Sequence, residues 1–207
     1  LAAQADAQEA DQLMQAGDAH AAIAKLQEAL SLNTSDDETR YNLVKLLISV
    51  GELEEAQAAL APKLSEIPLQ LRFDAINYWL QALLFVSTPP RAEWSFEQFD
   101  AAIAQNKRDF DTRLAKARVL IAAELFENAM EELLEIIMRD KTWNHEVARK
   151  TYVAILELLT PPKPKTDDAA VGKTAGGIEL TGKTAVQEDP VLEMISRYRR
   201  KLSMALN

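Results

Sequence analysis

The sequence has 207 residues, of which 48% are apolar, and it carries a net charge of −9 with no cysteine. This length and apolar content suffice to bury a core, while the lack of cysteine excludes structural disulfides, thiol catalysis and Cys-ligated zinc. The negative charge argues against nonspecific binding to nucleic acid or an anionic membrane, and no apolar run approaches the roughly 20 residues that span a bilayer.

A set of three residues, first a turn residue, then a small one and then a bulky one, recurs along the chain. The successive sets begin 34, 39 and 34 residues apart. The sets are Gly17, Ala22 and Leu26; Gly51, Ala56 and Leu60; Pro90, Ser95 and Phe99; and Glu124, Ala129 and Leu133. A period of 34 residues is typical of the tetratricopeptide repeat, a hairpin of two helices in which small residues let the backbones approach. The sequence therefore predicts an all-α solenoid of such hairpins, closed by a C-terminal capping helix.

Apolar periodicity and helix-end signals place the helices in chain order. Four pairs are expected, at residues 3–15 and 18–31, 37–50 and 53–65, 69–86 and 93–105, and 109–123 and 126–139, and one further helix ends near residue 159. The long step of 39 residues holds Pro62 and Pro89-Pro90, so the repeat should be most distorted there. Glu124 stands where a glycine is usual, which predicts either local strain or a wider bend.

The composition changes after residue 160. Proline, glycine and charged residues without apolar periodicity predict a flexible inserted loop over residues 161–189. Asp189 and Pro190 then form a strong helix start, and an apolar stripe predicts a helix over residues 190–207. The chain is thus expected to hold tetratricopeptide-like repeats in residues 1–160, a loop, and a capping helix.

One segment of the loop matches a nucleotide-binding pattern. Residues 177–184, Gly-Ile-Glu-Leu-Thr-Gly-Lys-Thr, satisfy G-x-x-x-x-G-K-[ST]. That pattern binds phosphate between a strand and a helix, and neither the proline-rich lead-in nor the short stretch before Pro190 supplies them. We interpret the match as coincidental. A nucleotide-using enzyme would instead bind ATP in a way that Lys183→Ala abolishes.

No catalytic or metal-binding arrangement is evident elsewhere. The two histidines, His20 and His145, are far apart in sequence and stand in no zinc-binding pattern. Adjacent carboxylates such as Glu54-Glu55 are typical of solvated helix faces. The sequence therefore predicts no catalytic residue, no cofactor and no metal, and we expect that the chain is not an enzyme.

The second half of the chain resembles a known family. Residues 106–115, 129–143 and 148–150, together with Asp-Pro-Val at 189–191 and Tyr-Arg-Arg-Lys-Leu-Ser at 198–203, are similar to the C-terminal repeat region of the chaperedoxins. These are bacterial thioredoxin-fold co-chaperones of the YbbN/CnoX type. The chain departs from that pattern by its inserted loop, and the thioredoxin-fold domain that precedes the repeats in the family is missing from this sequence.

The resemblance implies a cytoplasmic, stress-related holdase that binds unfolding client proteins and passes them to the chaperonin and the Hsp70 system. This chain would be its protein-interaction module, with no nucleic-acid or membrane partner. The alternative is a generic tetratricopeptide-repeat scaffold in an unrelated protein assembly.

Two sets of residues are candidate partner-binding positions. Stacked hairpins leave a concave face that suits a peptide or a partner helix, and its polar candidates are Arg40, Asn42, Lys45, Arg113 and Lys116. The terminal helix supplies the second set, Tyr198, Leu202, Met204 and Leu206. The apolar stripe of this helix should cap the end of the solenoid. Met204 lies off that stripe, and we interpret it as a docking tip for a chaperonin's apolar groove. Simple capping is the alternative for this helix.

Overall fold

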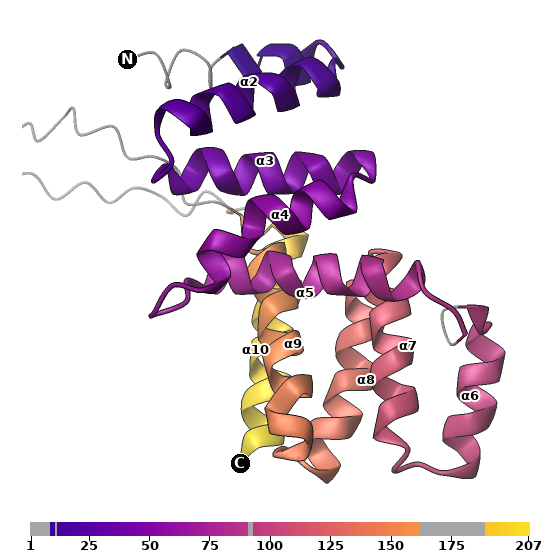
Figure 1. The fold of residues 1–207 in the computed structure, drawn as a ribbon. Helices are drawn as coiled ribbons and strands as arrows, with labels where there is room; N and C mark the ends of the chain where they lie inside the picture. The colour runs from indigo at the N-terminus through magenta and orange to yellow at the C-terminus, as the bar shows by residue number, and fades with distance from the viewer. Residues whose placement is uncertain (1–8, 11, 91–92, 162–188) are drawn as a thin grey trace, which may run out of the picture.

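The computed structural model describes residues 9–10, 12–90, 93–161 and 189–207, and in them the chain forms helices and no strand (Figure 1). The all-α prediction is thus confirmed. In chain order the helices are α2 (Ala19–Leu32), α3 (Asp37–Val50), α4 (Leu53–Leu64), α5 (Leu71–Val86), α6 (Phe96–Gln105), α7 (Phe110–Ala122), α8 (Phe126–Arg139), α9 (Trp143–Leu159) and α10 (Pro190–Leu206). Among these described helices, none is both long and apolar enough to cross a bilayer.

The hairpin of α3 and α4 shows how the repeated spacing works. Asp36 caps α3 by accepting hydrogen bonds from the backbone N–H groups of Glu38 and Thr39, both at 3.1 Å. Gly51 ends the helix with a φ of 85°, a conformation that glycine adopts without strain. The small Ala56 of α4 is fully buried where α3 and α4 pack together. The roles predicted for the turn residue and the small residue are confirmed here.

The third predicted pair, residues 69–86 with 93–105, does not form a hairpin, so this prediction is wrong. Helix α5 packs against α4, α7 and α9, whereas α6 packs mainly against α7 at the edge of the molecule (Figure 1). The connection from Val86 to Phe96 holds Pro89-Pro90 and is too long for a tight turn. In addition, the apolar side chains of α5 are already buried against other helices.

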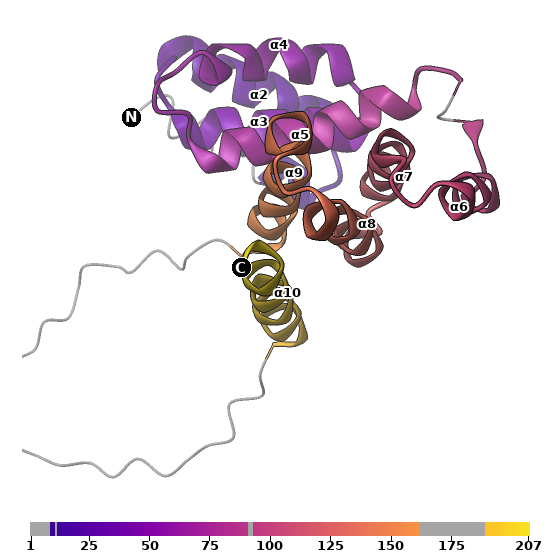
Figure 2. The same ribbon diagram turned by 90° about the horizontal axis from the view of Figure 1, so that it is seen from below.

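Helix α5 joins two hydrophobic cores. One core lies among α2, α3, α4 and α5, and the other lies mainly among α7, α8, α9 and α10. Trp79 of α5 packs against both. Figure 1 shows α2–α5 lying across the ends of the later helices, and Figure 2 shows α7–α10 nearly end-on. The solenoid therefore changes direction at α5, within the segment where the long repeat step predicts distortion.

The turn between α7 and α8 is strained, as predicted. Glu124 has a φ of 57°, while Gly17 and Gly51 occupy the equivalent turns with φ of 82° and 85°. Replacing Glu124 with glycine is expected to raise the free energy of unfolding by about 1 kcal/mol, because the left-handed conformation penalises a side chain. Urea denaturation measures this change. Gly51→Ala is the matched control and should lower stability by a similar amount, and a destabilised Glu124→Gly variant would contradict the prediction.

Candidate functional site

The terminal helix α10 starts as the sequence predicts. The Asp189 side chain accepts a hydrogen bond from the backbone N–H of Val191 at 2.9 Å, and Pro190 opens the helix. The helix packs against α8 and α9, and it buries Ile195 and Tyr198 in the second core. The prediction that its stripe caps the end of the solenoid is confirmed.

Tyr198 is the centre of this docking contact. Its single hydroxyl proton is shared between the carboxylates of Glu131 at 2.9 Å and Glu127 at 3.2 Å. The hydroxyl of Tyr152 donates to the backbone carbonyl of Tyr198 at 2.8 Å. Burial raises the pKa of both tyrosines above the ordinary value, so both hydroxyls keep their protons as donors at neutral pH.

Glu131 of α8 binds two residues of α10 through its carboxylate. Its carboxylate accepts hydrogen bonds from Tyr198 and from the Lys201 ammonium group. Burial alone would raise the pKa of Glu131, but these hydrogen bonds and the positive charges of Lys201 and Arg197 together hold the pKa below its ordinary value. Arg197 adds an ion pair with Glu127 at 2.6 Å. The contact between α8 and α10 therefore combines apolar burial with two ion pairs at its rim.

The structure separates the four candidates on α10 by role. Tyr198 is only 3% exposed, and Leu202 and Leu206 are half-buried against the second core, so these three residues hold the helix in place. Met204 is 72% exposed. It is the member of the set whose side chain is free to meet a partner.

Met204 borders an open apolar groove between α8 and α10. The groove has a volume of about 440 Å³ and is lined by Leu134, Met138, Met204 and Ala205, with Glu131 and Lys201 beside them. Met138 is 58% exposed. Sequence reasoning missed Met138, although it is an apolar residue off the buried stripe of α8. Exposed methionines adapt to varied apolar partners, which makes this groove a candidate interaction surface.

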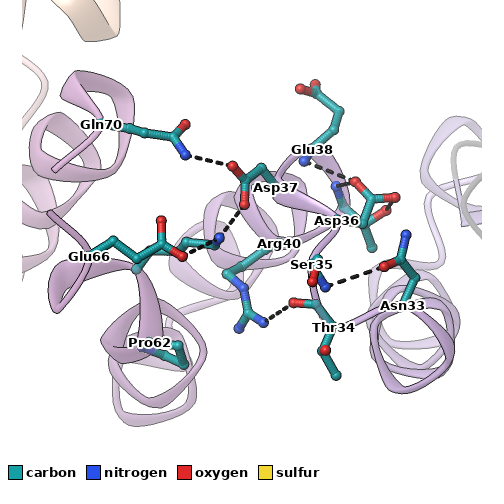
Figure 3. Close-up of polar contacts among 12 residues, drawn as sticks. Asn33, Thr34, Ser35, Asp36, Asp37, Glu38, Arg40, Pro62, Glu66 and Gln70 are labelled. Atoms are coloured by element: carbon teal, nitrogen blue, oxygen red, sulfur yellow. Dashed lines mark hydrogen bonds and ion pairs between the residues drawn. The ribbon is translucent and has the colours of Figure 1, made fainter. Parts of the chain in front are cut away.

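Arg40 was expected on the concave face, but its side chain is only 8% exposed. It donates to the backbone carbonyl of Thr34 at 2.9 Å (Figure 3) and to that of Ala59, also at 2.9 Å, and so joins α3 to the preceding turn and to α4. The expectation that Arg40 faces a partner is therefore wrong. Its bonds satisfy carbonyl groups within the fold.

Arg113 repeats the role of Arg40 on α7, so the expectation for this residue is wrong as well. It is 7% exposed, and it donates to the Lys107 carbonyl at 3.4 Å and to Glu132 at 2.7 Å. Both arginines thus bind the residue six positions earlier and the residue nineteen positions later. A charged side chain in this position cross-links the two helices of a hairpin.

The sequence does contain a pattern that could have indicated the structural role of Arg40 and Arg113. Asp36 and Asp109 each begin the pattern Asp-x-x-Thr-Arg at the start of a helix. In both copies the threonine hydroxyl donates to the aspartate, at 3.0 Å from Thr39 and 2.7 Å from Thr112. Repetition of a complete polar pattern indicates a structural role shared by both hairpins.

The remaining concave candidates differ in exposure. Lys116 is half-buried and forms ion pairs with Asp100 of α6 and Glu132 of α8, both at 2.6 Å. Asn42 and Lys45 are exposed on α3. Of the five candidates, these two present the most open side chains.

The other sequence features contribute no site to the described structure. The nucleotide-binding pattern at 177–184 lies outside the described residues. His20 and His145 are both exposed. Across residues 9–10, 12–90, 93–161 and 189–207, no cluster of three or more His, Cys, Asp or Glu side chains could hold a metal ion.

Comparison with protein families finds two matches, both to models described as tetratricopeptide repeat, at residues 13–84 and 91–169. The first match ends within α5 and the second begins before α6, so their junction falls where the solenoid changes direction. No curated protein matches the sequence.

Proposed function

Because this chain belongs to the tetratricopeptide-repeat proteins over residues 13–84 and 91–169, we propose that it is the interaction module of a thioredoxin-like holdase co-chaperone. Tetratricopeptide repeats are protein–protein interaction modules. In the proposed role the module binds unfolding clients in the bacterial cytoplasm and passes them to the chaperonin and the Hsp70 system.

The observation that carries the proposal is the groove between α8 and α10. Two methionines, Met138 and Met204, expose most of their side chains around it. A partner's apolar segment would cover them, because exposed apolar surface gains free energy when it is removed from water. The resemblance over residues 106–159 and 189–203 supports the same assignment, since these residues build α7, α8, α9 and α10.

A generic scaffold role is the second candidate. Asn42 and Lys45 on α3, remote in sequence from the groove, would serve such a scaffold as polar contacts for an unrelated protein. This candidate predicts binding that depends on α3 and not on the methionines.

The test replaces Met204 with serine and measures affinity for a purified chaperonin by titration calorimetry. We expect a loss of roughly tenfold, which corresponds to about 1.4 kcal/mol for one exposed anchor. Leu192→Ser is the matched control, because Leu192 is an exposed apolar residue of α10 outside the groove. Equal affinities for the unchanged protein and the Met204→Ser variant would refute the chaperonin proposal.

A further inference from the structure

The connection between α4 and α5 exposes an apolar surface that no described helix covers. Ile67, Leu69 and Leu71 are 97%, 39% and 46% exposed, and the connection projects beyond the ends of both helices (Figure 1). No other stretch of five described residues holds three exposed large apolar side chains. Contiguous apolar patches of this kind mark interaction sites, whereas single exposed residues do not. We call residues 66–71 the apolar loop.

Polar contacts fix both ends of the apolar loop to α3. Gln70 donates to the carboxylate of Asp37 at 2.6 Å (Figure 3). Lys63, near the end of α4, forms ion pairs with Asp37 at 2.5 Å and with Glu66 at 2.6 Å. A surface that is already ordered loses little conformational entropy when it binds. The apolar loop is therefore presented in a form that is ready to dock.

The base of the apolar loop carries excess negative charge. Three carboxylates share two cations there, and the five groups are Asp37, Glu38, Glu66, Lys63 and Arg72. Glu66 directly precedes Ile67, and its side chain is 44% exposed. The surrounding part of the chain is acidic as well, since residues 12–90 hold ten acidic and five basic side chains. A complementary surface should therefore be apolar with a basic rim.

The groove between α8 and α10 has both properties. Met138 and Met204 in its lining can adapt to varied apolar shapes. Helix α10 carries four basic side chains and one acidic side chain. Arg200 lies one helical turn before Met204 and so on the same side of α10. It is exposed, and it forms no ion pair with any residue that the structure describes.

Another groove, beside α6, suits an acidic loop less well. It has a volume of about 350 Å³, and its apolar lining residues are Phe96, Leu120 and Leu125. Its charged lining residues are Lys116, Glu131 and Glu132. Two carboxylates against one ammonium group disfavour the approach of a further carboxylate. The charges therefore favour the groove between α8 and α10.

We propose that the apolar loop of one chain inserts into the groove between α8 and α10 of a second copy, with Ile67 against Met138 and Met204 and with Glu66 near Arg200. The loop does not fill the groove of its own chain, because Ile67 is 97% exposed and the loop is fixed to α3. The contact joins two different surfaces and is therefore heterologous. Self-association covers the groove in which the chaperonin is proposed to dock, and only this consequence rests on the proposed function.

The test measures the average mass of the whole chain by sedimentation equilibrium over a series of concentrations. We expect a mass that rises with concentration above that of one chain. Ile67→Ser and Met204→Ser should each weaken the association at least tenfold, because each removes an apolar anchor from the contact. Leu125→Ser is the matched control, because Leu125 is exposed and apolar but lines the other groove, and it should associate like the unchanged protein.

A mixture of Ile67→Ser with Met204→Ser gives a second readout. Both positions are exposed, so neither substitution should disturb the fold. The first variant keeps an intact groove and the second keeps an intact loop. The mixture should therefore form a one-to-one complex at concentrations where each variant alone remains a single chain.

The contribution of charge is tested with Arg200→Glu. This variant should weaken the association several-fold at low salt and less at high salt, because ions screen an exposed rim charge. Arg108→Glu makes the same change in net charge at an exposed position outside the groove, and it should have no effect.

The proposal is overturned by a mass of one chain at every concentration, by association that persists in Met204→Ser, or by a mixture that forms no complex. The chaperonin assay is independent of these outcomes. Ile67→Ser leaves Met204 in place and should bind the chaperonin at least as tightly as the unchanged protein. The two proposals therefore fail separately.

Discussion

Replacing Tyr198 with alanine is expected to lower the free energy of unfolding by about 3–5 kcal/mol, the range observed for large aromatic residues removed from cores. The ring is buried between α10 and the second core, and Tyr152 lies beside it with ring centroids 6.4 Å apart. Loss of the ring leaves a cavity, and loss of the hydroxyl leaves Glu131 with one hydrogen-bond donor fewer. Urea denaturation followed by circular dichroism measures the change.

Two further variants separate the contributions of the ring and the hydroxyl. Tyr198→Phe keeps the ring and should lower stability by only about 1–3 kcal/mol, because it removes hydrogen bonds to carboxylates. Arg200→Ala, at an exposed position of the same helix, should change stability by less than about 0.5 kcal/mol. If Tyr198→Ala were as stable as Arg200→Ala, α10 would not serve as the cap of the solenoid.

Replacing Arg113 with methionine is expected to lower the free energy of unfolding by about 2–3 kcal/mol, because hydrogen bonds to charged groups are lost in a buried position. The arginine joins the Lys107 carbonyl to Glu132 of α8. Glu132 keeps its ion pair with Lys116 at 2.6 Å, so its charge is not left wholly unpaired. Because this ion pair remains, we expect a smaller loss in the free energy of unfolding than a fully isolated buried charge would cause.

The control for Arg113 is Lys45→Met, which removes one positive charge from an exposed position on α3. It should leave the free energy of unfolding within about 0.5 kcal/mol of the unchanged protein. Both variants are measured by urea denaturation. Similar values for the two would show that Arg113 does not cross-link α7 and α8, and would return it to the set of partner-facing candidates.

Most of the helices could be predicted because their signals are local. Asp36, Gly51 and Asp189 act on residues next to them in sequence, and each ends or begins a helix where expected. The strain at Glu124 follows from the same kind of evidence, since equivalent turns carry glycine. The packing of α5 against α7 and α9, in place of α6, could not be predicted in this way. It depended on whether the apolar face of α5 would meet α6 or the distant α9.

The features of the candidate site also differ in whether they depend on residues close in sequence or on distant ones. The stripe of α10 and the position of Met204 off that stripe follow from helical periodicity. Arg40 and Arg113 were expected to be exposed because arginine is seldom buried. Their burial depends on partners such as Ala59 and Glu132, nineteen residues away in sequence. The groove lined by Asp74, Arg118 and Thr151 could not be predicted for the same reason, since three separate helices, α5, α7 and α9, supply its lining.

By itself, the sequence determined the helical class, the repeat spacing and the capping role of α10, because each depends on residues within one or two turns of one another. Only the tertiary structure decided that the solenoid changes direction at α5, that two arginines serve the fold, and that Met138 lies beside Met204 at one groove. Each of these outcomes depends on which groups from distant segments come together, because a charge is stabilised or left unpaired according to its neighbours in space.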